Sequence, residues 1–152
     1  MRNDDILPEL RQMYKDSPII DLENGLMDAR SLPKPVYERS PLVLTTVDRF
    51  NGPESDLLVK IYEKKDRGDE ILPGVFWIHG GGYVLGHPDV DDGICEKFVL
   101  DANCVVVSVD YRLAPEYPYP AAIEDCYSGL KWMVDNADSL RIDTSRIGIA
   151  GA

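Results

Sequence analysis

The sequence FWIHGGGY occupies residues 76–83 and joins an apolar run to three consecutive glycines. Glycine loses more backbone entropy on folding than any other residue, so three in a row weaken a helix or a strand. A chain accepts this cost where backbone N–H groups must approach another group closely. We therefore expect a buried strand that ends at His79, followed by a loop whose amides come close to an anionic oxygen.

Strand and helix patterns alternate around this loop. Residues 104–109 read CVVVSV, a nearly continuous apolar run that is typical of a strand covered on both faces. From residue 75 onward the order strand–helix–strand–helix–strand predicts two βαβ units. The expected fold is therefore α/β, with a mostly parallel sheet and helices on both faces. The predicted strands are 42–50, 57–62, 75–78, 104–109 and 146–150, the predicted helices are 89–102 and 120–136, and Thr144 and Ser145 are expected in a turn.

Residues 1–41 differ from the rest of the chain because five prolines divide them into short pieces. Leu7, Leu10, Met13 and Tyr14 share one face of a short predicted helix. This segment is either a lid over a pocket or a wrap on the core, and the sequence does not choose between them. Residues 42–152 are expected to form the first half of the core domain.

The net charge and the cysteine content of this 152-residue chain exclude several classes of binding partner and site. The formal net charge of −11 disfavours binding to nucleic acid and to anionic membranes. Cys95, Cys104 and Cys126 form no C-x-x-C pair, so neither a disulfide framework nor a zinc site is expected. Reduced, buried thiols and a cytoplasmic location follow as predictions, and no metal is expected.

Three kinds of anion could occupy the glycine loop. A dinucleotide pyrophosphate requires G-x-G-x-x-G, but Leu85 stands at the sixth position counted from Gly80. A nucleoside triphosphate requires a lysine and a hydroxyl, and His87 and Pro88 replace them. The oxyanion of an acyl-transfer intermediate needs only backbone donors. This third anion fits an acidic chain best, and no cofactor is expected.

The family resemblance rests on four segments. Residues 79–82 read HGGG, the oxyanion-loop motif of lipases and esterases. Together with VDYRLAPE, PYPAAIED and DTSRI at 109–116, 118–125 and 143–147, they resemble the hormone-sensitive-lipase-like branch of the α/β-hydrolases. The resemblance covers residues 75–152, and more loosely those from 42. It implies a carboxylic-ester hydrolase with a Ser-His-Asp triad and a small-molecule ester as substrate.

In that branch the nucleophile motif reads Gly-Asp-Ser-Ala-Gly-Gly, and Gly151 fits its first glycine. The resemblance therefore implies that the serine directly follows Ala152 and that the whole triad lies beyond residue 152. We expect these 152 residues to be inactive alone and to need the remainder of the same protein to complete the fold. A non-catalytic small-molecule binder on the same fold is the alternative, and assembly with further copies is left open.

The resemblance also assigns roles within the loop. Gly81 and Gly82 donate their N–H groups to the oxyanion, while His79 and Gly80 support the loop. Tyr83 is a candidate contact for the acyl group. The remaining polar residues have structural interpretations: His87 is expected in a surface loop, Ser108 in the core, and Arg112 paired with Glu116, Glu124 or Asp125.

Overall fold

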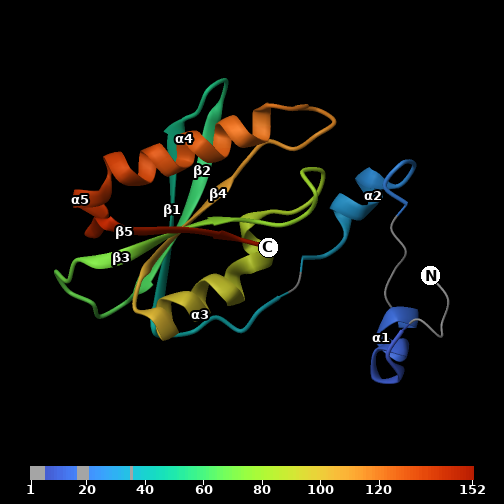
Figure 1. The fold of residues 1–152 in the computed structure, drawn as a ribbon, viewed down its shortest axis with the longest axis horizontal. Helices are drawn as coiled ribbons and strands as arrows, with labels where there is room; N and C mark the ends of the chain where they lie inside the picture. Colours follow the sequence, from blue (N-terminus) through green and yellow to red (C-terminus); the bar gives the residue numbers. More distant parts are fainter. Residues whose placement is uncertain (1–5, 17–20, 35) are drawn as a thin grey trace. The chain divides into compact units, whose positions relative to one another are not determined.

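The computed structural model describes residues 6–16, 21–34 and 36–152. They divide into two compact units, Met1–Leu32 and Pro33–Ala152. The first unit contains a 3₁₀ turn, η2 (Pro8–Leu10), and two short helices, α1 (Arg11–Asp16) and α2 (Leu26–Ser31) (Figure 1). The helix predicted near Leu10 is thus present as η2 and α1, whereas α2 was not predicted. A lid or wrap role for this segment stays a prediction.

The second unit is built on one five-stranded sheet with the order β1-β2-β4-β3-β5. β3 runs parallel to β4 and to β5, as predicted. β1 and β2 form an antiparallel hairpin, because the short turn between them cannot make a parallel crossover. β2 also pairs with β4 in the antiparallel direction. The sheet is therefore mixed. Its strands are β1 (Val43–Asn51), β2 (Asp56–Lys64), β3 (Leu72–Ile78), β4 (Val105–Asp110) and β5 (Ile142–Gly151).

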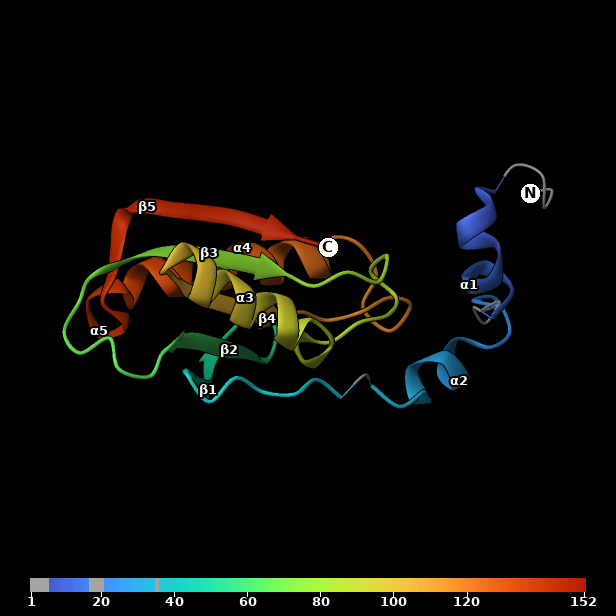
Figure 2. The same cartoon turned by 90° about the horizontal axis from the view of Figure 1, so that it is seen from below.

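Helices cover both faces of this sheet, and Figures 1 and 2 show α3 and α4 on opposite sides of it. Every residue of β4 up to Val109 is buried, which confirms the prediction from CVVVSV. Val106 packs in one core cluster with Cys95 and Val99 of α3, whereas Val107 packs in the other with Met133 of α4. The helical elements are η3 (Pro88–Asp91), α3 (Asp92–Ala102), α4 (Ala121–Asp135) and α5 (Ala137–Leu140).

The prediction that Thr144 and Ser145 form a turn before the last strand was wrong, because β5 already begins at Ile142. Its register against β3 shifts between the partners Ile142 and Ile147, so the intervening residues bulge. Asp143 accepts hydrogen bonds from the N–H and the hydroxyl of Ser145, at 2.9 and 2.6 Å. Turn-like side-chain contacts thus occur inside a strand, which the sequence pattern alone did not distinguish.

The three cysteines are all free thiols. Cys95 and Cys104 are buried as predicted, while Cys126 is only half-buried. Burial raises the pKa of the Cys95 thiol to about 12, so this side chain is a protonated, unreactive part of the core.

The carboxyl ends of β3 and β5 lie side by side, since Ile78 pairs with Gly151. The N–H of Ala152 donates to the carbonyl of Ile78 at 3.3 Å. β4 ends at the same edge, because it is parallel to β3. Ligand sites of open α/β sheets lie at this edge, and the glycine loop begins here.

Candidate active site

The glycine loop leaves β3 in a backbone conformation that only glycine adopts easily. Gly81 has φ +127° and Gly82 has φ +61°. The carbonyl of Gly81 accepts the N–H of Leu85 at 2.9 Å, and a Cβ on Gly81 would clash with the Leu85 carbonyl oxygen. A Cβ on Gly82 would meet nothing within 4 Å. The space above Gly82 is therefore open, while Gly81 is closed in by its own loop.

Both glycines expose their backbone. Within the described part of the chain, the N–H groups of Gly81 and Gly82 donate to no acceptor. An oxyanion hole requires two such donors, held in place before the reaction and free of other partners. The geometry is compatible with this role, which stays a prediction for both residues.

Gly80 lies against the end of β5. A Cβ on Gly80 would sit 3.1 Å from the carbonyl oxygen of Ala152. Glycine at this position therefore lets the loop pass close to the adjacent strand. The close approach supports the predicted role of Gly80 in shaping the loop, without testing it.

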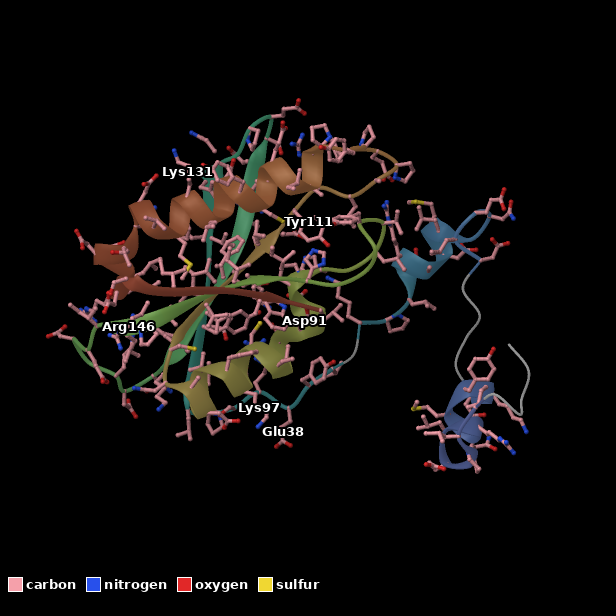
Figure 3. The ribbon with its side chains drawn as sticks, in the orientation of Figure 1. Glu38, Asp91, Lys97, Tyr111, Lys131 and Arg146 are labelled. Atoms are coloured by element: carbon pink, nitrogen blue, oxygen red, sulfur yellow. The ribbon has the colours of Figure 1, made fainter. Side chains whose placement is uncertain are left out.

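His79 is 2% exposed and fastens the start of the loop. Its ring stacks on Tyr111, with centroids 4.1 Å apart and planes within 9°, and its carbonyl accepts the Tyr111 hydroxyl at 2.8 Å. Nδ1 lies 2.9 Å from the carbonyl oxygen of Gly80. Since a carbonyl only accepts, we assign the proton to Nδ1. Figure 3 shows Tyr111 beyond β4, next to the glycine loop.

These contacts are those of a bracing residue, and they fit the predicted role of His79. Burial lowers the pKa of the imidazole, which favours the neutral form. Nε2 is buried and has no hydrogen-bond partner among residues 6–16, 21–34 and 36–152. A buried ring whose Nδ1 proton is already committed is poorly suited to act as a catalytic base.

Acidification is expected to destabilise the fold through His79. Its pKa lies below 6.5 in the folded chain and near 6.5 in the unfolded chain. As the pH falls below about 6.5, the unfolded state binds a proton that the folded state does not, so the free energy of unfolding decreases. Urea unfolding at about pH 7.5 and about pH 5.5 measures this. His79→Gln should lose less stability between these two values than the wild type, and equal losses would contradict the assignment.

Tyr83 follows the glycines and has an unusual backbone conformation, with φ +66°. Its carbonyl accepts the N–H of Ala114 at 2.9 Å, which links the glycine loop to the loop after β4. The side chain is 64% exposed and its ring centroid lies 6.5 Å from that of Tyr111. Contact with an acyl group stays a prediction.

His87 lies in the loop before η3, as expected, and its ring has specific partners there. Its side chain is only 30% exposed, and Nδ1 accepts the N–H of Asp89 at 3.1 Å, which caps η3. Nε2 lies 3.6 Å from the Asp110 carboxylate. His87 thus fixes the beginning of η3 from within this loop. The helix predicted from residue 89 thus starts as the 3₁₀ turn η3 and becomes α-helical from Asp92.

Arg112 forms the predicted ion pair with Asp125. Nε and Nη2 each lie 2.8 Å from a different carboxylate oxygen, and the Arg112 N–H donates to the same carboxylate at 3.0 Å. A second partner, Glu54, was not predicted and lies 2.5 Å from Nη1. Ser108 is fully buried, which confirms its placement in the core.

A buried cluster of charged side chains beneath α3 was not predicted from the sequence. Lys60 is 5% exposed and binds Asp89 at 2.7 Å and Asp92 at 2.5 Å. Arg39 joins the cluster through Asp92 and Glu96, at 2.6 Å each. The cluster fastens the segment before β1 to α3. The apolar residues of 89–102 predict the helix but not its charge partners. These partners lie 29 to 57 residues apart in the sequence, so no local pattern reveals them.

Comparison with known proteins decides the family. Residues 75–152 match the family model described as the alpha/beta hydrolase fold. The chain belongs to the α/β-hydrolase family. The chain is 40% identical over 124 residues to esterase LipI of Mycobacterium tuberculosis, covering 80% of the chain and 38% of the relative. It is 35% identical over 159 residues to an arylesterase of Saccharolobus solfataricus, covering 95% and 49%.

Solved structures agree with this membership. The hyperthermophilic esterase of Pyrobaculum calidifontis superposes with a TM-score of 0.79 at 31% identity, covering 96% of the chain and 49% of that protein. A bacterial heroin esterase gives a TM-score of 0.85 at 27% identity, covering 96% and 48%. These matches confirm the resemblance to the hormone-sensitive-lipase-like branch and the α/β-hydrolase fold. The chain spans half or less of the length of these relatives.

No helix within residues 6–16, 21–34 and 36–152 has the length and apolar character that a membrane crossing requires. No group of three histidine, cysteine, aspartate or glutamate side chains in the described ranges is arranged to hold a metal ion.

Proposed function

We propose that the chain supplies the oxyanion hole of a carboxylic-ester hydrolase. One observation carries the proposal: the N–H groups of Gly81 and Gly82 are without acceptors among the described residues and lie at the edge where β3 and β5 end. As the attacking hydroxyl adds to the ester carbonyl, negative charge develops on the carbonyl oxygen. Two backbone donors stabilise that charge, and losing one such donor costs on the order of 10²–10³ in rate.

The triad itself is proposed to lie outside these 152 residues. Ser108 is fully buried, His79 is committed to bracing the loop, and His87 caps η3. The end of β5 passes within 3.1 Å of the position that a Cβ on Gly80 would occupy. A serine placed directly after Ala152 would thus begin beside the glycine loop, where a nucleophile must stand to attack a carbonyl held by Gly81 and Gly82.

The proposal predicts that activity requires more than these residues. We expect the 152-residue chain to hydrolyse 4-nitrophenyl acetate no faster than its own His79→Ala/Gly81→Ala double variant. A longer protein that contains this chain and a downstream triad should hydrolyse the ester well above both. Release of 4-nitrophenol, followed by absorbance, measures all three proteins.

If the chain alone hydrolyses the ester faster than the double variant does, the nucleophile lies within residues 1–152. That result would refute the proposal that the triad lies outside these residues. Binding of the ester by the longer protein without turnover would favour the alternative, a small-molecule binder on the same fold.

The three free thiols fit a reducing compartment, so a cytoplasmic location is part of this proposal.

A further inference from the structure

The two ends of the glycine loop lie against each other. Gly86, the last residue of the loop, has φ +102°. A Cβ on Gly86 would clash with the carbonyl oxygen of Gly80 and with the His79 ring. Since His79 is stacked on Tyr111, the entrance of the loop is held in place. The position of the exit depends on the residues that follow Gly86.

The backbone between these ends is short and internally bonded. The N–H groups of Val84 and Leu85 both donate to the carbonyl of Gly81, at 3.2 and 2.9 Å. That carbonyl and the N–H of Gly82 belong to the same planar peptide group. Leu85 directly precedes Gly86, so a shift at the exit of the loop moves Leu85 and turns the N–H of Gly82 with it.

His87 fastens the exit of the loop to η3. It directly follows Gly86, and its Nδ1 accepts the N–H of Asp89 at 3.1 Å. Its carbonyl accepts the N–H of Val90 at 3.0 Å, and its Nε2 lies 3.6 Å from the carboxylate of Asp110, the last residue of β4. The exit of the loop is therefore fixed between η3 and the end of the adjacent strand.

Asp89 in turn connects η3 to the interior. Its carboxylate accepts hydrogen bonds from Lys60 at 2.7 Å and from Lys34 at 3.0 Å. Lys60 is 5% exposed and also binds Asp92 at 2.5 Å, and the Tyr62 hydroxyl donates to Asp92 at 2.7 Å. Burial alone would raise the pKa of Asp89, but the hydrogen bonds from Lys60 and Lys34 outweigh burial and lower it to about 2. The carboxylate is therefore charged at the pH of an esterase assay.

We propose that His87 and Asp89 are positioning residues for the oxyanion donors, an inference that rests on the proposed hydrolase function. They join the exit of the glycine loop to the buried ammonium of Lys60 through successive hydrogen bonds. Donors stabilise a transition state only when they are held where its charge develops. Both side chains act through the loop and not on the substrate.

The first test compares two carboxylates that bind buried cations. Asp89→Ala removes one partner of Lys60, which keeps Asp92. Glu63→Ala is the matched control, because Glu63 binds Arg67, whose side chain is 6% exposed and keeps three backbone carbonyls as acceptors. β2 is antiparallel to β4, so Glu63, next to the last residue of β2, lies at the edge of the sheet opposite the glycine loop.

A second pair of variants tests the cap of η3. His87→Ala removes the acceptor of the Asp89 N–H, whereas His87→Asn supplies a side-chain oxygen of the kind that caps helix starts. All variants are made in the longer protein that contains this chain, with 4-nitrophenyl acetate as substrate. Hydrogen–deuterium exchange of residues 80–86, followed by mass spectrometry, provides a readout that does not depend on turnover.

We expect Asp89→Ala and His87→Ala each to lower kcat about tenfold and to change KM less than about twofold, because a displaced donor is missed only in the transition state. The loss is partial, since Asp91 at the other end of η3 still accepts the indole N–H of Trp77 at 2.8 Å. Exchange in residues 80–86 should become faster in both variants. Glu63→Ala and His87→Asn should keep kcat and exchange within about twofold of the wild type.

Unchanged exchange of residues 80–86 in Asp89→Ala and His87→Ala would overturn the positioning role. Equal losses of kcat in Asp89→Ala and Glu63→Ala would also overturn it, because they would indicate general destabilisation. If the wild type shows no turnover while exchange follows the expected pattern, the hydrolase function fails and the attachment of the loop to Lys60 stands. The two failures are therefore distinguishable.

Discussion

Asp125→Ala is expected to lower the free energy of unfolding by about 3–5 kcal/mol, as measured by urea denaturation. Asp125 is fully buried and accepts three hydrogen bonds from Arg112. Removing the carboxylate leaves a guanidinium in the interior with Glu54 as its remaining charged partner among the described residues. Glu54 is 71% exposed, so solvent screens most of that attraction.

Two variants separate the cost of an orphaned charge from the cost of lost packing. The double variant Arg112→Met/Asp125→Leu removes both charges and should recover part of the loss, because no unpaired charge remains buried. Glu54→Gln removes only the exposed partner and should cost less than about 1 kcal/mol. A double variant that is less stable than Asp125→Ala would show that the pair stabilises the fold through its own attraction, contrary to this expectation.

A charge at the end of a buried strand needs a nearby partner of opposite sign, so the sequence predicted that Arg112 pairs with Glu116, Glu124 or Asp125, and the structure shows the pair with Asp125. Glu54 could not be predicted in the same way, since it belongs to the β1–β2 turn and lies 58 residues away in the sequence. Residue type indicates that a partner is required. Only the folded hairpin brings this particular carboxylate to the guanidinium.

The features of the fold also divide into those that the local sequence predicts and those that depend on contacts between distant segments. The apolar run of β4 predicts burial on both faces. Alternate residues of the strand point to opposite faces of the sheet, and a helix covers each face. The bulge at Thr144 and Ser145 depends on the register between β5 and β3, which is a property of two strands together. Strand and helix periods are local signals, whereas register and pairing direction are not.

At the glycine loop, some features of the site could be predicted from the sequence and others could not. The motif predicted the loop and its position at the end of a strand. It did not predict that His79 stacks on Tyr111, because this contact joins residues at the ends of two different parallel strands. Nor did it predict the apolar pocket that Tyr83 forms with residues of the stretch 114–123.

Replacing either Gly81 or Gly82, the proposed oxyanion donors, is expected to reduce esterase activity of a longer protein that contains this chain by about 10²–10³. Gly81→Ala places its Cβ against the Leu85 carbonyl, so the loop must shift and its amides with it. Gly82→Ala meets no neighbouring atom. Its methyl group would instead enter the open space that we assign to the reacting carbonyl. Initial rates on 4-nitrophenyl acetate measure both losses.

Gly68 provides the control for Gly82, since the two glycines have nearly the same φ and both have open space where a Cβ would lie. Gly68 has φ +58°, Gly82 has φ +61°, and a Cβ on either would meet nothing within 4 Å. Alanine in this left-handed region should cost each variant about 1–2 kcal/mol of stability. Because the backbone strain is matched, any difference in activity reports on location. Full activity in Gly82→Ala would mean that the substrate carbonyl lies elsewhere, while an equal loss in Gly68→Ala would attribute the effect to strain alone.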